Sequence, residues 1–328
     1  MLGDGEKAMQ TLIGISKLSC CLAVGMLFLF CHSRTDQRVS QAVSSPTPIQ
    51  EVKNKDAGND NGLEQSIWVG RVGDFQIRWT TLDIYIDDQK LLSPVVQKEF
   101  EEFVSELKKD VRPGEQMLAC DYGRDFSIVS IVGTLVSLDD QYGIICAKAS
   151  IGERFTTIDI SNRQVLRTGA KISLDGGPAL PNKVRLSNYF DERTILHAVL
   201  SDPLIREALK NEGAKADPGT LAEVASFFEG HPAAIRSNGG HFSLPADFLT
   251  RFAFDHIENN VVSVRISLEP ASEAEHALHS ELEFLLPIPK SLEKPLNLAA
   301  SREEGFLMKD AEKVGGNQVT TFSFRTPT

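Results

Sequence analysis

The sequence predicts an α+β fold in which a mostly antiparallel sheet, a β-meander plus late strands, packs with short helices. Stretches of alternating apolar and polar residues, the period of half-buried strands, occur in both halves of the chain. Helical patterns gather at 94–111 and 191–230, and they do not alternate regularly with strands as in a parallel doubly wound sheet. Apolar residues make up 41% and charged residues 24% of the 328 residues, the balance of a globular protein with its own core.

The charge balance excludes some classes of protein. The chain has 34 Lys and Arg against 45 Asp and Glu, which gives a net charge of −11. This acidity argues against a nucleic-acid binder, because phosphate contacts need a basic surface. It is compatible with a basic protein partner. Composition also excludes collagen-like, coiled-coil, disulfide-scaffold and multispan membrane proteins.

One apolar run near the start of the chain predicts export. It extends from Leu18 to Cys31, with Lys17 before it, and is shorter than the roughly 20 residues of a spanning helix. A positive residue followed by such a run is typical of a secretory signal peptide. Residues 1–33 are therefore predicted to be a signal peptide or, if residues 11–31 stay uncleaved in the membrane, an anchor. We expect an extracytoplasmic protein of the periplasm or cell envelope, either secreted or held by a single membrane pass.

Polar segments flank the predicted globular part. Residues 34–66 are rich in Ser, Gln, Pro, Asn and Asp without an apolar period, which predicts a disordered tether. Residues 293–328 are similarly polar and are expected to form a tail. Within that tail, residues 319–324 alternate weakly, which is compatible with a last edge strand or with a loose end.

The N-terminal half, residues 67–150, begins with strands predicted at 67–72 and 75–86 and a turn at Asp87-Asp88. Ser93-Pro94 then opens a helix over 94–111. Its apolar positions recur every three or four residues and form one stripe, made of Val96, Phe100, Phe103, Leu107 and Val111.

A meander is predicted after this helix. Residues 126–138 and 143–151 are expected to pair as a hairpin around a loop at 139–143, where Asp139-Asp140 favours a turn. Residues 154–160 supply a third strand. The helix over 94–111 can cover one face of this sheet.

The C-terminal half, residues 151–292, combines helices and strands. Three short helices are predicted, begun by Asp191, by Asp202-Pro203 and by Asp217-Pro218. Strands are predicted after them at 248–255, 261–268 and 282–288.

Several of these stretches are similar to a known bacterial family. They are Phe155–Asn162 (FTTIDISN), Val184–Leu209 with its Leu-Ser-Asn-Tyr-Phe run before a helix, Arg251–His256 (RFAFDH) and Glu283–Leu292 (EFLLPIPKSL). Over 94–292 the chain resembles the lysozyme-binding extracytoplasmic domain of RsiV-type anti-sigma factors. That domain also stands at the front of PdaC-type peptidoglycan deacetylases.

The resemblance implies an exported α+β domain that binds lysozyme or a similar wall-active protein. The chain departs from the family at its Gly-Gly-Ala-His turn, which should fall near 144–152, where this sequence has IICAKASIG. Asn238–His241 (NGGH) is superficially like that turn but lies elsewhere in the chain.

No motif predicts a catalytic residue or a cofactor site, so we expect neither enzyme activity nor a cofactor. No metal site is expected either, although Glu275, His276 and His279 could offer ligands. The simpler interpretation of that cluster is a solvated connector between strands. Cys120 and Cys146 are the cysteines beyond the apolar run, and they either pair as a disulfide or remain buried thiols.

Three hypotheses of function follow. The first is a non-catalytic protein-binding module of the cell envelope, with a basic or wall-active partner such as lysozyme. The second is a peptidoglycan-binding module. The third is a hydrolase whose site no motif reveals, with His241 and His256 as candidate general bases.

Overall fold

A computed structural model describes residues 64–111, 116–117, 119–146, 149–161, 172–173, 177–178, 183–213, 217–272, 275, 278–315 and 318–326. They belong to one compact unit, residues 60–328. The predicted signal peptide or anchor and almost all of the predicted tether lie outside the described residues. No helix in the described ranges combines the length and the apolarity that crossing a bilayer requires.

The chain enters the fold through a small antiparallel sheet, which we name the N-terminal sheet. Its strands are β1 (Ser66–Val72), β2 (Phe75–Thr80), β3 (Ile84–Ile86) and β4 (Gln89–Lys90), paired in chain order. The strand predicted at 67–72 is confirmed. The one predicted at 75–86 divides in two at 81–83, where the chain turns. The predicted turn at Asp87-Asp88 is also confirmed, with positive φ at both residues, as a tight hairpin requires.

Helix α1 (Ser93–Asp110) confirms the predicted helix within one residue at each end. Its first turn is held by Asp83, a fully buried residue ten positions earlier. The Asp83 carboxylate accepts hydrogen bonds from the backbone N–H of Leu92 (2.9 Å) and Ser93 (3.2 Å). An acidic group at this place also suits the positive end of the helix dipole.

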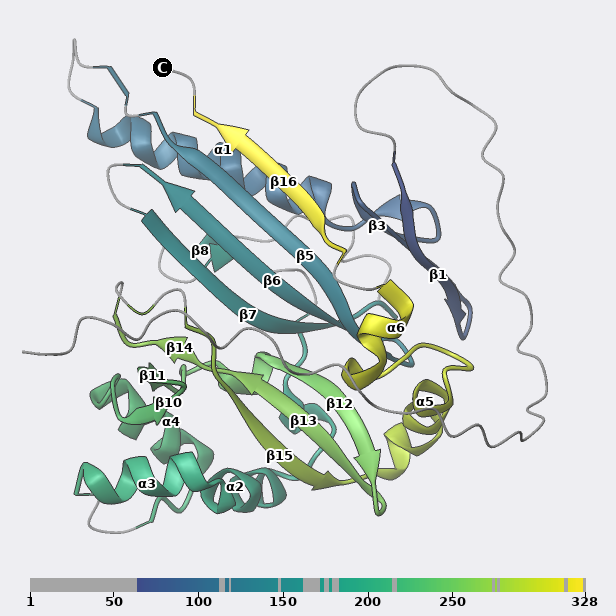
Figure 1. Ribbon diagram of the computed structural model, residues 1–328, viewed down its shortest axis with the longest axis vertical. Helices are drawn as coiled ribbons and strands as arrows, with labels where there is room; N and C mark the ends of the chain where they lie inside the picture. The colour runs from purple at the N-terminus through teal and green to yellow at the C-terminus, as the bar shows by residue number, and fades with distance from the viewer. Residues whose placement is uncertain are drawn as a thin grey trace, which may run out of the picture. The chain divides into compact units, whose positions relative to one another are not determined.

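The central sheet has the strand order β16-β5-β6-β7, with all neighbours antiparallel (Figure 1). Its strands are β5 (Asp121–Val132), β6 (Leu135–Ile145), β7 (Ala149–Asp159) and β16 (Thr320–Arg325). Apolar side chains of α1 share one core with this sheet and the N-terminal sheet. The expectation that the helix over 94–111 covers the meander is therefore confirmed.

The loop predicted at 139–143 is wrong. β6 runs straight through these residues, and the hairpin turn lies instead at Gly133, whose φ is +56°. Two aspartates in sequence favour a turn only when both can stay in water. Here Asp140 is fully buried and paired with arginines, so it fits the middle of a strand.

The second sheet, β12-β13-β15, is antiparallel and carries helices on one face (Figure 1). Its strands are β12 (Phe252–Glu258), β13 (Val261–Ser267) and β15 (Glu281–Pro287), and the helices are α2 (Glu192–Ser201), α3 (Pro203–Asn211) and α4 (Leu221–Gly230). Alternate residues of all three strands join one apolar core with these helices.

The helix starts follow local capping chemistry. Asp191 and Asp202 accept hydrogen bonds from backbone N–H groups of the first turns of α2 and α3, which confirms both predicted starts. The third helix begins later than predicted, because Thr220 caps it and accepts from Glu223 N. The strand predicted from residue 248 also begins later, at Phe252, after a single 3-10 turn over Phe248–Thr250.

Short strands complete the described chain. β10 (Ile235–Ser237), β11 (Gly240–Ser243) and β14 (Glu269–Pro270) form a small sheet, and β8 (Ile172–Ser173) pairs with β9 (Gly177–Pro178).

Hydrogen bonds connect the second sheet to the central sheet. Phe254 N donates to Ser130 Oγ (3.3 Å), and Phe155 N donates to Ser267 Oγ (3.0 Å). Val129, Phe155 and Ala253 pack together beside them. The expected division of the chain between residues 150 and 151 falls inside β7, so it does not separate two structural halves.

The expected polar tail over 293–328 is instead part of the fold. Helix α5 (Lys290–Ser301) buries Leu292, Leu296 and Ala299, and a 3-10 turn (Met308–Asp310) and α6 (Ala311–Gly315) follow it. β16 then pairs with β5, as the edge-strand alternative predicted. Gly305 (φ +83°) passes so close to the carbonyl of Ile131 that a side chain there would collide with it.

Candidate functional site

The residues considered as possible metal ligands, Glu275 and His279, have separate partners. Glu275 Oε1 accepts a hydrogen bond from His241 N (3.0 Å) and lies 3.0 Å from His241 Nδ1. His279 Nδ1 lies 2.5 Å from Glu153 Oε2, on a strand of the central sheet. His276 lies outside the described residues.

Another three-residue group comes close enough to hold an ion. Ligand atoms of Asp255, His256 and Glu283 all lie within 4.8 Å of one another. A β-bulge in β12 places Asp255 and His256 together, since two residues of β12 there oppose one residue of β13. The sequence prediction missed this group because a bulge interrupts the strand period.

Arg265 already contacts both carboxylates of that group. Its Nε donates to Asp255 Oδ2 (3.0 Å), and its Nη2 lies 3.5 Å from Glu283 Oε2. Ser263 Oγ donates to the other Glu283 oxygen (2.7 Å), and His256 Nδ1 lies 3.2 Å from Asp255 Oδ2. A metal ion would have to displace the guanidinium, so we interpret the group as an ion-pair cluster.

This cluster adjoins further carboxylates, because Glu281 is repelled by both Asp255 and Glu153, and Asp139 is repelled by Glu153. We name these carboxylates together the acidic face, which consists of Asp139, Glu153, Asp255, Glu281 and Glu283. Burial raises the pKa of Glu281, and the neighbouring carboxylates Glu153 and Asp255 add to the rise while Arg265 opposes it. Burial and the charge of Glu153 raise the pKa of Asp139 to about 8. The local cations therefore do not fully compensate the ionised carboxylates of this group.

Strand β15 forms the open edge of the second sheet. Within the described part of the chain it pairs with β13 alone. Leu268 N donates to Ser280 O (3.0 Å), which fixes the pattern: even-numbered residues of β15 direct their backbone groups to β13. The backbone groups of Glu281, Glu283 and Leu285 consequently point away from the sheet.

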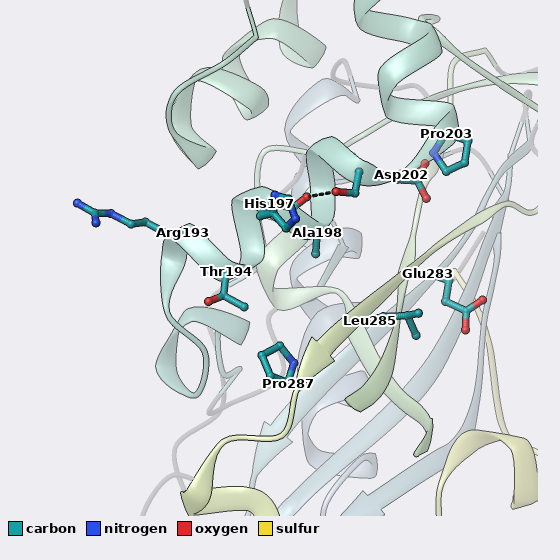
Figure 2. A pocket seen from close by; sticks show the side chains of 10 residues that line it. Arg193, Thr194, His197, Ala198, Asp202, Pro203, Glu283, Leu285 and Pro287 are labelled. Atoms are coloured by element: carbon teal, nitrogen blue, oxygen red, sulfur yellow. Dashed lines mark hydrogen bonds between the residues drawn. The ribbon is translucent and has the colours of Figure 1, made fainter. Parts of the chain in front are cut away.

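A groove runs along this edge between β15 and helix α2 (Figure 2). Its volume is about 620 Å³, within the usual range of binding pockets. We name it the edge groove. Its walls are Arg193, Thr194, His197, Ala198 and Ser201 of α2, Asp202 and Pro203 at the start of α3, and Glu283, Leu285 and Pro287 of β15.

The side chains of the edge groove suit the binding of a partner better than catalysis. Leu285 is 57% exposed, which is unusual for a leucine in a strand. Ser201 Oγ donates to the backbone carbonyl of His197 (2.7 Å), a bond internal to the helix that Figure 2 shows as a dashed line. Figure 2 also shows the side chain of Arg193 extending away from the groove.

Neither candidate general base lines this groove, although His256 lies close to Glu283, which does. His241 contacts Glu275, and His256 contacts Asp255. The sequence prediction missed the edge groove altogether. One signal was available, because Leu285 stands at the outward position of an alternating strand.

Cys120 and Cys146 form a disulfide in the structure, with an S–S distance of 2.10 Å. The disulfide joins the start of β5 to the end of β6. Of the two alternatives for these cysteines, the structure shows the paired one.

Comparison with protein-family models, curated proteins and solved structures finds no match to this chain.

Proposed function

We propose that this chain is a non-catalytic binding module of the cell envelope, exported or membrane-tethered, and that its partner is a basic, wall-active protein of the lysozyme type. The observation that carries the proposal is the acidic face beside the open edge of β15. Burial and mutual repulsion raise the pKa of Asp139 and Glu281 in this face, which means that their ionised forms are disfavoured. An approaching cation stabilises the ionised forms. A basic protein surface supplies such cations.

Three further features support the proposal. The sequence resembles a lysozyme-binding domain over 94–292, as described above. The Cys120–Cys146 disulfide also suits an oxidising compartment outside the cytoplasm. The apolar run Leu18–Cys31 supplies the means of export that this location requires.

A capture experiment tests the proposal. The full chain is immobilised and exposed to egg-white lysozyme at low and high salt. We expect capture at low salt and much less at high salt, because salt screens exposed charges. The double variant Glu281→Gln, Glu283→Gln should bind about tenfold more weakly than the wild type.

A matched variant separates a local effect from net charge. Glu207→Gln, Glu229→Gln also removes two negative charges, from exposed positions on α3 and α4. It should retain nearly the wild-type affinity. Equal loss in both double variants, or no capture of lysozyme at low salt, contradicts the proposal. Sedimentation of the chain with purified peptidoglycan, unchanged by the Glu281 and Glu283 substitutions, would support the peptidoglycan-binding alternative instead.

A further inference from the structure

The two edges of the second sheet differ in what covers them. At β12, Phe254 N donates to Ser130 Oγ of the central sheet (3.3 Å), and Thr157 Oγ1 donates to the carbonyl of Phe252. Both contacts use backbone groups of this edge. Among the described residues no comparable strand or hydroxyl contacts the outward backbone of β15. The sheet is therefore closed by the fold on one side and open on the other.

The position of Pro287 also indicates that the outward edge of β15 is open. Proline has no N–H, and in a sheet it is tolerated where that group would point away from a neighbouring strand. Pro287 is an odd-numbered residue of β15, opposite Val261, so its missing N–H falls on the open edge. The edge thus offers N–H donors at Glu281, Glu283 and Leu285, and it ends at Pro287.

The side chains along this edge specify what could pair with it. Glu281 and Glu283 alternate with the buried Leu282 and Phe284, and Leu285 continues the outward row. A strand laid beside β15 would place every second side chain next to this outward row. The matching sequence has cations beside the two glutamates and an apolar residue beside Leu285.

Helix α2 forms the floor for the other side chains of such a strand. Thr194, His197, Ala198 and Ser201 line the edge groove beneath the open edge. They are small or polar, so they suit short polar side chains such as threonine. In Figure 2, Glu283 and Asp202 lie toward one end of the groove and Pro287 toward the other. The negative charge is therefore concentrated where the cations of the partner would lie.

We infer that the partner binds by adding an extended cationic segment to β15, antiparallel to it, as a fourth strand of the second sheet. The inference rests on the proposed function and specifies its binding mode. Backbone hydrogen bonds to Glu281, Glu283 and Leu285 supply affinity, and the alternating side chains supply selectivity. The antiparallel direction continues the pairing of β12, β13 and β15.

The direct test is amide hydrogen exchange of the full chain, resolved to single residues, with and without saturating lysozyme. The amides of Leu282, Phe284 and Leu286 bond to β13, and their exchange should be slow in both states. The amides of Glu281, Glu283 and Leu285 should exchange fast in the free chain and about tenfold or more slowly in the complex. Binding without protection of these odd-numbered amides overturns the inference and leaves the proposed function standing.

A synthetic peptide tests the same geometry independently of lysozyme. The blocked heptapeptide Thr-Thr-Val-Thr-Lys-Thr-Lys, laid antiparallel, sets its valine beside Leu285 and its lysines beside Glu283 and Glu281. N-methylation of the first lysine removes a hydrogen bond to β15, and N-methylation of the threonine before it alters an amide that points away. The first modification should abolish protection of the odd-numbered amides, and the second should not.

The outcomes separate the two proposals. Strand addition alone is overturned if the two methylated peptides protect the odd-numbered amides equally. It is also overturned if none of the three peptides protects them while lysozyme still binds. Failure of the chain to bind either lysozyme or the peptide overturns the proposed function together with the inference.

Discussion

Asp139 and Asp140 are neighbours in β6, and their carboxylates lie on opposite faces of the central sheet. Asp140 is fully buried and accepts hydrogen bonds from Arg124 Nε (3.0 Å) and Arg154 Nε (3.3 Å). Asp139 belongs to the acidic face, where Gln141 Nε2 donates to it (3.3 Å) and Glu153 repels it. The ionised form of Asp140 is therefore stabilised by the fold, whereas the ionised form of Asp139 is destabilised.

This difference predicts opposite responses to the same substitution. Asp140→Asn should lower the free energy of unfolding by about 3–5 kcal/mol, because it leaves two buried arginines without their shared counter-charge. Asp139→Asn should change it by less than about 1 kcal/mol at pH 7, because the raised pKa already favours the neutral form. Urea unfolding of both variants beside the wild type measures the difference. Equal destabilisation would contradict the assignment of the two faces.

Glu99 predicts a pH dependence of stability. It lies on α1, where its Oε2 accepts hydrogen bonds from Tyr122 OH (2.7 Å) and Arg124 Nη1 (2.8 Å). Burial raises its pKa to about 7, although Arg124 opposes the rise. Between pH 4.5 and 7 the folded chain therefore keeps a proton that the unfolded chain releases, so the Glu99 contribution to stability falls as pH rises through this window.

Glu99→Gln lacks this titration. Its stability relative to the wild type should consequently improve by about 3 kcal/mol between pH 4.5 and pH 8. Urea unfolding of both proteins at the two pH values tests this. Glu101→Gln, at an exposed position of the same helix, serves as the control and should show a much smaller change. A wild-type and Glu99→Gln difference that is the same at both pH values would argue against a protonated Glu99.

The disulfide predicts a sizeable contribution to stability. Cys120 and Cys146 close a loop with a sequence separation of 26. In the chain-entropy model such a loop stabilises by about 3.5 kcal/mol. The variant Cys120→Ser, Cys146→Ser should fold and unfold at correspondingly lower urea concentration. The wild type should show the same shift after reduction, and a wild type insensitive to reductant would contradict the pairing.

Thr320 tests whether the C-terminal segment belongs to the fold. Its Oγ1 accepts a hydrogen bond from Trp79 Nε1 (3.2 Å) and donates one to Thr80 O (2.5 Å). Thr320→Val leaves both buried partners unsatisfied and should cost about 1–3 kcal/mol. The adjacent Thr321 is exposed, so Thr321→Val serves as the matched control and should have little effect. Indistinguishable stabilities of the two variants would favour the loose-tail interpretation.

Local signals predicted most of the secondary structure. The apolar stripe of α1, the caps Asp191 and Asp202, and the alternation in β13 and β15 each arise from residues a few positions apart. Such patterns depend on the chain's own geometry and are visible in one sequence. They sufficed for the α+β class, which the structure confirms.

Contacts between distant residues account for what the sequence could not predict. The buried position of Asp140 depends on Arg124 and Arg154, which lie on two other strands. The Asp83 contact with the first turn of α1 and the Thr320 contact with Trp79 are of the same kind. From its sequence neighbours, each of these polar residues would be expected to be exposed to solvent. Only the hydrogen bond to a partner distant in the sequence makes its burial favourable.

The edge groove was unpredictable for a related reason. Its walls come from α2 and β15, which are about eighty residues apart in the chain. The alternation of β15 indicated which side chains face outward, but which edge of the sheet stays open depends on strand order. Strand order follows from the packing of whole elements and leaves no local pattern.

The affinity of the full chain for lysozyme at low salt, measured by calorimetric titration for the wild type and for Leu285→Pro, tests the central claim most directly. Proline at this position removes an N–H from the open edge and leaves the bonds to β13 intact, as Pro287 already does two residues later. The account predicts that the wild type binds and that Leu285→Pro, with an unchanged thermal unfolding profile, binds at least about tenfold more weakly. Equal binding by the two proteins, or no binding by the wild type, would contradict it.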